Sequence, residues 1–286
     1  MNLDELIEGW VIRVSVGFAD EVWVVRGYRH PTGSVIATPY IRGSRKLKPY
    51  DFSNIPVWLS RYVECIGRVA PVLSNHAVIS VFDPRVALRI RRAELWPEVR
   101  ELIEYMNPEW VGLTGSWAVF NERDYSDVDL LVYGNHAEMY KTLRDLKTEG
   151  LIEACRLEER FYKVGDKLSW ADYSRLAYSK LLDSCFKSRP YTLRILRSIA
   201  REPCSDVLTP LGYYTGVFEI VDASESYLTP ARYIAETNGR RFVVETWHTR
   251  YSELPLGTYK GKLRLVASRE GVIASPDIDG WVSMVD

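Results

Sequence analysis

Residues 115–133 read GSWAVFNERDYSDVDLLVY, and this stretch determines which fold and which chemistry we expect. The apolar run that begins at Val128 predicts a buried strand, and side chains two residues apart on a strand project from the same face. Asp127 and Asp129 are therefore predicted to lie side by side. A hard cation such as Mg²⁺ or Mn²⁺ takes oxygen ligands, usually one or two carboxylates together with substrate phosphates. The two aspartates are thus our candidate metal ligands and catalytic residues for phosphoryl chemistry.

The residues upstream of the aspartates predict a strand, a turn and one helical turn. We expect the strand at 110–113, the turn at Gly115 and Ser116, and the helical turn at 117–120. Amide groups at a helix start attract phosphate oxygens, and a glycine allows a phosphate to approach the backbone. Gly115 and Ser116 are therefore predicted to bind the phosphates of a nucleotide. The alternative for an isolated Asp-x-Asp sequence is a solvated turn that carries two carboxylates.

The order of these parts resembles the nucleotidyltransferase superfamily, which includes polymerase beta, the poly(A) and CCA-adding enzymes and the aminoglycoside nucleotidyltransferases. Its signature is Gly-Ser or Gly-Gly after a hydrophobic residue, a spacer, and then Asp-x-Asp between hydrophobic residues. Here ten residues separate Ser116 from Asp127. The resemblance implies a short mixed sheet with helices, metals bound by Asp127 and Asp129, and a triphosphate at Gly115 and Ser116. It implies transfer of a nucleoside monophosphate from a nucleoside triphosphate to an acceptor, with release of pyrophosphate.

A second resemblance extends over most of the chain. Four segments are similar to motifs of a group of archaeal predicted nucleotidyltransferases: residues 27–31, 35–37, 189–194 and 228–233. In that group the Gly-Ser and Asp-x-Asp core lies between two additional segments. The resemblance implies an archaeal source and flanking domains. It also singles out Lys187 and Arg194, which lie beside and within the third segment, as residues that bind the nucleotide.

The formal net charge of -1 hides an uneven distribution of charge along the chain. Residues 108–155 carry nine acids and four bases, whereas residues 156–201 carry eleven bases and five acids. This basic segment, which includes Arg156 and Arg160, could neutralise the negative charge of a triphosphate or of an RNA backbone. The alternative for each of these residues is a solvated helix face. RNA is therefore a candidate partner next to the nucleoside triphosphate.

Length and composition limit the number of domains and the class of protein. A chain of 286 residues is long enough for two or three domains, and no apolar stretch approaches the roughly 20 residues of a membrane span. The acidic start is unlike a signal peptide, so we expect a cytoplasmic protein without a membrane partner. The four cysteines and four histidines show no zinc spacing, and buried reduced thiols are the default expectation. The absence of glutamine suggests a thermophile, in which a disulfide stays possible.

The hydrophobic periodicity predicts an α+β protein in four parts. Residues 1–55 should form a small antiparallel sheet with strands at 10–14, 21–26 and 34–38, and His30 should fix a loop there rather than catalyse. Residues 56–107 should be a helical connection with helices at 56–67 and 84–106. Residues 108–204 should be the nucleotidyltransferase core, with helices at 136–149 and 169–186 and a strand at 191–195. Residues 205–286 should form an all-β barrel or sandwich.

The pattern departs from the superfamily at one point. Active members carry a third carboxylate on a later strand, but residues 191–195 contain an arginine and no acid. Glu158, Asp172 and Asp222 are candidates, none of them between strand hydrophobics. If the third acid is missing, the alternative is a non-catalytic nucleotide- or RNA-binding protein that keeps the fold. A third hypothesis is a structural subunit of a larger assembly. The sequence does not identify the acceptor.

Overall fold

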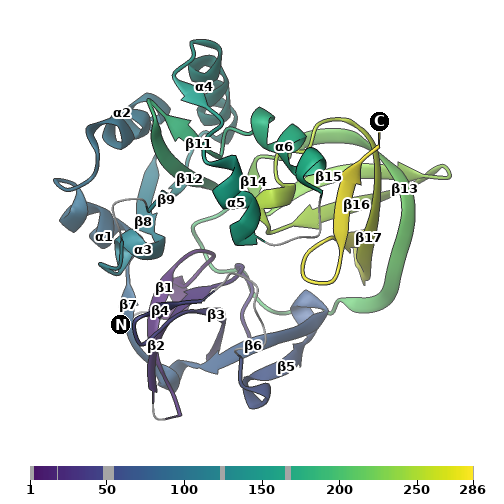
Figure 1. Cartoon of the computed structure of the whole chain (residues 1–286). Coiled ribbons are helices and arrows are strands. Elements are labelled where there is room, and N and C mark those ends of the chain that lie inside the picture. The colour runs from purple at the N-terminus through teal and green to yellow at the C-terminus, as the bar shows by residue number, and fades with distance from the viewer. Residues whose placement is uncertain (1–2, 18, 48–54, 123–125, 165–168, 286) are drawn as a thin grey trace.

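The computed structural model describes residues 3–17, 19–47, 55–122, 126–164 and 169–285. The chain is a mixed α+β protein, as predicted, and its strands form three sheets with few helices. Figure 1 shows the N-terminal sheet below, the second sheet with helices α1–α4 above it, and the C-terminal barrel to one side. None of the helices in the described part of the chain has both the length and the apolar character that crossing a bilayer requires.

The first sheet has the strand order β5-β6-β3-β2-β1-β7, with the short β4 paired to β3, and all its pairings are antiparallel. Its strands are β1 (Val11–Val16), β2 (Ala19–Val25), β3 (Ser34–Arg42), β4 (Arg45–Lys46), β5 (Ser60–Val63), β6 (Arg68–Ser74) and β7 (Val78–Phe82). The three strands predicted before residue 40 are confirmed. The helix predicted at 56–67 is wrong, because β5 and two 3-10 turns occupy that segment. A short apolar run fits both periods, and pairing with β6 decides the outcome.

The second sheet has the order β10-β11-β12-β9-β8, and β14 pairs with β12. Its strands are β8 (Trp110–Thr114), β9 (Val128–Tyr133), β10 (Ile152–Glu153), β11 (Asp183–Phe186), β12 (Arg189–Leu196) and β14 (Leu228–Thr229). β9 lies between β8, which is antiparallel to it, and β12, which is parallel to it. The helix predicted at 169–186 stops at Ser179, and its last residues form strand β11 instead.

Six α-helices accompany the strands in the described residues: α1 (Pro84–Arg91), α2 (Pro97–Met106), α3 (Gly115–Ala118), α4 (His136–Thr148), α5 (Leu157–Val164) and α6 (Trp170–Ser179). Local signals set several of their ends. A proline starts α1 and another starts α2, where its missing N–H costs nothing. The Asn135 side chain accepts a hydrogen bond from the Glu138 amide and caps α4, which was predicted at this place.

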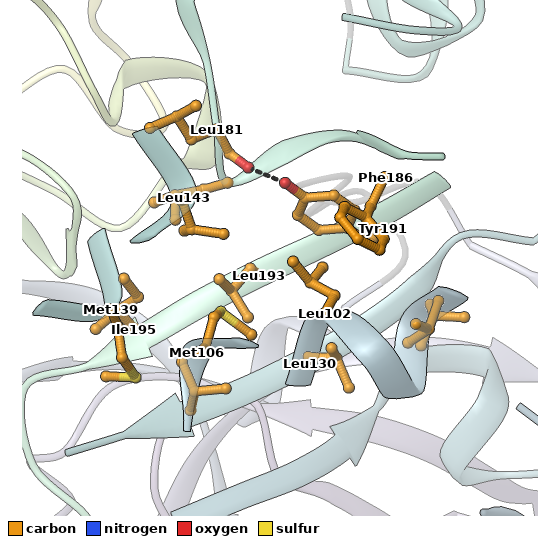
Figure 2. Close-up of a cluster of buried hydrophobic side chains, with 14 of the residues drawn as sticks. Leu102, Met106, Leu130, Met139, Leu143, Leu181, Phe186, Tyr191, Leu193 and Ile195 are labelled. Atoms are coloured by element: carbon orange, nitrogen blue, oxygen red, sulfur yellow. Dashed lines mark hydrogen bonds between the residues drawn. The ribbon is translucent and has the colours of Figure 1, made fainter. Parts of the chain in front are cut away.

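One face of the second sheet packs against α2 and α4. Leu130, Leu193 and Ile195 on the strands meet apolar side chains of both helices, as Figure 2 shows, and all three are at most 1% exposed. The Tyr191 hydroxyl donates a hydrogen bond to the Leu181 carbonyl within this core. Because full burial of such a side chain contributes roughly 1.5–3 kcal/mol, this cluster holds the sheet to the helices.

The opposite face of the second sheet packs against the first sheet. Leu131 and Leu196 join the apolar cluster of the N-terminal residues, which includes Trp10 and Trp23. Gly9 has φ +85°, and a Cβ added there would lie 2.8 Å from the Leu131 Cδ2 atom. The N-terminal segment therefore lies directly on strand β9.

The C-terminal part is a closed five-stranded barrel, which resolves the predicted choice between barrel and sandwich. Pairings run β13-β15-β16-β18-β17 and return from β17 to β13, and β19 adds to β17. The strands are β13 (Thr209–Glu225), β15 (Ala231–Thr237), β16 (Arg240–Thr246), β17 (Gly257–Ser268), β18 (Gly271–Ser275) and β19 (Trp281–Met284). Closure pairs the edges that an open sheet would expose.

Two disulfides overturn the default expectation of reduced thiols. Cys65 is bonded to Cys204 across 139 residues, and Cys155 to Cys185 across 30. The first ties the first sheet to the segment before the barrel. The second ties the residues before α5 to strand β11.

His30 has the structural role that was predicted. Its ring is 2% exposed, and Nδ1 accepts a hydrogen bond from the Ile36 amide at 3.1 Å. Burial, assisted by the charge of Arg201, lowers the pKa of His30 to about 3. The folded protein therefore keeps this imidazole neutral where an unfolded chain would protonate it.

We predict that His30 makes the fold sensitive to mild acid. Between pH 7 and pH 5 the unfolded chain binds a proton at this ring and the folded chain does not, so His30 should lower the free energy of unfolding by about 2 kcal/mol over that interval. His30→Asn keeps a side-chain acceptor but does not titrate. Urea unfolding of both proteins at pH 5, 6 and 7 should show the extra loss only in the wild type, and parallel pH dependences would contradict the prediction.

Candidate functional site

Asp129 lies on β9, an interior strand of the second sheet. It faces Thr114 on β8 and Thr192 on β12 in the strand register. The neighbouring Val128 is fully buried in the helix-covered core, so Asp129 projects from the other face. Asp127 directly precedes β9, and its charge acts on Asp129. The two carboxylates thus act on each other electrostatically, whereas Asp127 lies just outside the strand that was predicted to hold both.

Gly115 lies against the carboxylate of Asp129. A Cβ added to Gly115 would lie 2.0 Å from the Asp129 Oδ2 atom, and Gly115 has φ +64°. Only glycine fits this position, on both counts. Ser116 is buried in the following turn, and its carbonyl accepts a hydrogen bond from the Asn121 amide at 2.9 Å. The structure thus places the Gly-Ser turn against Asp129 through Gly115, and the short helix starts at Gly115 rather than at residue 117.

The surroundings of Asp129 favour the protonated form of its carboxyl group. Burial, followed by the charge of Asp127, raises its pKa to about 6. Lys46 and Arg194 act in the opposite direction. Lys46 comes from β4 of the first sheet and Arg194 from β12, so the first sheet contributes a positive charge to this site.

Asp127 is paired with arginines of the basic segment. Arg156 Nη1 lies 3.2 Å from Asp127 Oδ1, and Arg160 Nη2 lies 3.9 Å from Oδ2. Arg160 is 4% exposed, and its Nη1 lies 3.0 Å from Asp183 Oδ1. One buried guanidinium therefore bridges Asp127 and Asp183.

Asp183 is a further acid near Asp127 and Asp129, and it was not among the candidates from the sequence. It lies on β11 opposite Thr192, whose hydroxyl donates to Asp183 Oδ1 at 3.2 Å, and Thr192 in turn faces Asp129. The charge of Asp183 contributes to the raised pKa of Asp129. The sequence signal was an acid between strand hydrophobics at 181–186, which the wrongly predicted helix concealed.

The three acids considered from the sequence have other surroundings. Asp172 accepts a hydrogen bond from the Ser169 hydroxyl at 2.7 Å at the start of α6, and Asp222 accepts one from the Ser224 amide on the barrel. Glu158 lies in the first turn of α5 and is exposed to solvent.

The two predicted cationic residues lie in different places. Arg194 projects from the face of Asp129, where it pairs with Glu8 and lowers the pKa of Asp129. Lys187 lies at the far end of β11, where its ammonium is 2.6 Å and 2.7 Å from the two carboxylate oxygens of Glu101 on α2. The structure therefore does not bring Lys187 to the carboxylates.

The donor types suit a hard divalent cation, because Asp127, Asp129 and Asp183 supply only carboxylate oxygens. No group of three or more histidine, cysteine or acidic side chains in the described residues is arranged closely enough to hold a metal. Arg156 and Arg160 occupy oxygens that a metal would use. Metal binding at this site would therefore require these guanidinium groups to change partners.

Comparison of the chain with models of protein families, with characterised proteins and with solved structures finds no match.

We predict that Asp129 destabilises the fold at neutral pH. Its raised pKa means that the folded state holds a proton between about pH 4 and pH 6 that the unfolded state has lost, so the stability from this group falls as the pH rises through that window. A shift from 3.8 to about 6 is worth at most about 3 kcal/mol. In metal-free buffer, Asp129→Asn should gain stability over the wild type between pH 4 and pH 7.5. An unchanged difference in unfolding free energy across that range would contradict the prediction.

Proposed function

We propose that the protein is a metal-dependent nucleotidyltransferase that moves a nucleoside monophosphate from a nucleoside triphosphate to an acceptor. The observation that carries this proposal is the contact between Gly115 and the carboxylate of Asp129, beside two further acids that share its electrostatic environment. It joins the Gly-Ser turn and the Asp-x-Asp strand, which are the two parts of the superfamily signature. The second sheet, with its helices on one face, would be the nucleotidyltransferase core.

Asp127 and Asp129 would hold the divalent cation, and Asp183 stands where a third acid could assist them. A bound Mg²⁺ or Mn²⁺ would neutralise charge on phosphate oxygens during in-line attack. The chain itself supplies the remaining groups. Gly115 leaves space at the backbone beside the carboxylates, and Arg194 and Lys46 add positive charge on the same side. Arg156 and Arg160, once separated from the acids, present guanidinium groups whose geometry matches phosphate oxygens.

The second candidate is a nucleotide- or RNA-binding protein without catalysis. The observation that favours it is the neutralisation of Asp127 and Asp183 by Arg156 and Arg160. If these ion pairs persist, the carboxylates balance buried charges instead of binding metal. The acceptor of the proposed transfer is an RNA or another hydroxyl-bearing molecule, and an RNA fits the basic segment best.

We predict that Arg156 competes with the metal for Asp127. The metal stabilises the folded state by mass action, so MgCl₂ or MnCl₂ should raise the melting temperature of the wild type. Arg156→Ala should increase that shift, because it removes a guanidinium group that pairs with Asp127 at 3.2 Å. The double variant Asp127→Asn/Asp129→Asn should show no shift. Thermal unfolding with and without EDTA tests this, and a metal-induced shift that survives in the double variant would place the metal elsewhere.

We predict turnover that depends on Asp127. Incubation with α-labelled nucleoside triphosphates, Mg²⁺ or Mn²⁺ and a pool of RNA should yield labelled RNA and pyrophosphate. Asp127→Ala should abolish both products, since the loss of several kcal/mol of transition-state stabilisation slows turnover by at least about a thousandfold.

The matched control for this assay is Asp145→Ala, which removes an exposed carboxylate on α4 outside the site and should leave turnover unchanged. The second candidate function gives a different result. Salt-sensitive binding of triphosphate or RNA, without labelled product for any of the four nucleotides, would favour binding over transfer.

A further inference from the structure

A cavity of about 380 Å³ lies between the first sheet and the barrel, and neither Asp127 nor Asp129 lines it. Its walls come from the loop after β2, from β3 and β6 of the first sheet, from the segment between β12 and β13, and from β15, β16, β17 and β18 of the barrel. Cavities of this size commonly hold small organic molecules. Val69 is 59% exposed and the Arg269 side chain 85% exposed, so this part of the lining forms the opening to solvent.

The charges of the lining are nearly balanced, with seven arginines and six acidic residues. Most of these groups pair with each other inside the lining. Arg29 pairs with Glu202 at 2.9 Å, and Arg232 pairs with Glu245 at 2.8 Å. The cavity is therefore not positive throughout, and any binding of an anion has to come from particular arginines.

Arg264 is the arginine that the lining leaves without an ion pair. Its Nη1 donates to the Gly67 carbonyl at 2.8 Å, and no carboxylate of the described residues lies within 4.0 Å of its guanidinium. Burial, followed by the charge of Arg68, lowers the pKa of Arg264, and Tyr213, Asp279 and Asp277 each act in the opposite direction. Arg68 lines the same cavity and directly follows Gly67, so an anion that accepts a hydrogen bond from Arg264 would also be attracted by the charge of Arg68.

Arg197 provides a second unsatisfied donor in the lining. Its Nε is buried and has no hydrogen-bond partner among the described residues, although its Nη2 reaches Pro230 and Glu225. A buried donor without an acceptor costs about 1–3 kcal/mol. A ligand with acceptor oxygens would recover that energy.

Part of the lining is apolar. Ile273 and Val266 come from the barrel, and Ile66 comes from the first sheet. Trp247 adds a ring that packs against Gly27 and lies 5.5 Å from the Tyr28 ring, centroid to centroid. An occupant that satisfies both kinds of wall carries an anionic group and a flat apolar part.

The two halves of the cavity are fixed to each other, so the site exists before a ligand arrives. The Cys65–Cys204 disulfide forms part of its edge. The Tyr62 hydroxyl donates to the Leu208 carbonyl at 3.1 Å, and Arg264 bonds to Gly67 across the same junction. A preformed site binds with little loss of conformational entropy.

We propose that this cavity binds a small organic anion, with its phosphate or carboxylate group at Arg68 and Arg264 and its apolar part against Trp247 and Ile273. This binding site is separate from the proposed transferase site and does not depend on it.

Isothermal titration calorimetry in metal-free buffer tests the proposal with four probes. Phenyl phosphate and benzoate carry the anionic group and the ring, inorganic phosphate lacks the ring, and benzyl alcohol lacks the charge. One or both of the aromatic anions should bind saturably with one site per chain and more tightly than inorganic phosphate or benzyl alcohol. The tighter of the two identifies phosphate or carboxylate as the preferred group. Absence of saturable binding for both aromatic anions would overturn the proposal.

Three variants locate the binding. Arg264→Ala should weaken the aromatic anion about tenfold or more, because it removes a charged donor. Val69→Trp, at the exposed opening, should block entry without disturbing a core position. Arg241→Ala is the matched control, because Arg241 is a 73% exposed barrel arginine outside the lining. Unchanged affinity in both Arg264→Ala and Val69→Trp would overturn the proposal.

A fourth variant separates this cavity from the carboxylate site. Asp127→Asn/Asp129→Asn should bind the aromatic anion as the wild type does. Loss of binding in that variant alone would place the anion near the second sheet and overturn the cavity assignment. The proposed transferase activity is tested separately, by the assay with labelled nucleoside triphosphates.

Discussion

The structure depends on the burial of strand β9 on both faces. Leu130, Leu131 and Val132 are all fully buried, so a single layer of helices could not cover the strand. The helices α2 and α4 cover one face, and the N-terminal segment covers the other, where Gly9 contacts Leu131 and the Thr114 hydroxyl donates to the Gly9 carbonyl. The first sheet is therefore required to complete the core of the second, and polar side chains are confined to the start of β9.

This confinement explains the electrostatics of the site. Three carboxylates gather where the apolar cover ends, and partly desolvated acids of like charge repel each other. Arg156 and Arg160 relieve the repulsion at Asp127 and Asp183, whereas Asp129 keeps a raised pKa. The Cys155–Cys185 disulfide helps to place these arginines, because Cys155 directly precedes Arg156 and Cys185 lies two residues after Asp183. The charges of Asp127 and Asp183 are thus compensated by arginine, and the proposed divalent cation would have to compete with these ion pairs.

Sequence patterns predicted those elements whose structure depends on interactions between residues close in the chain. The helix α4 and the barrel strands have clear periods, and the Gly-Ser and Asp-x-Asp sequences did come together as expected. The errors have non-local causes. The segment at 56–67 has an apolar spacing that suits either structure, and its partner β6 decides for a strand. The link from Cys65 to Cys204 spans 139 residues, which no spacing rule reveals. Asp183 was missed because its strand, β11, had been predicted as part of a helix. Lys187 is close to Arg194 in the sequence, but it lies in the turn between β11 and β12, whereas Arg194 lies near the other end of β12.

Glu8 links the lining of the cavity to strand β12 of the second sheet. It lines the cavity, accepts hydrogen bonds from the Gly27 amide and from Arg26, and pairs with Arg194 on β12. It is also 1% exposed, and a buried carboxylate between two arginines responds to charge on either side because water does not screen it. Its ion pairs with Arg26 and Arg194 therefore tie the N-terminal segment both to the cavity lining and to strand β12. A buried acid held in this way fixes the two sheets to each other at the point where they meet, because removal of either arginine would leave part of its charge without compensation.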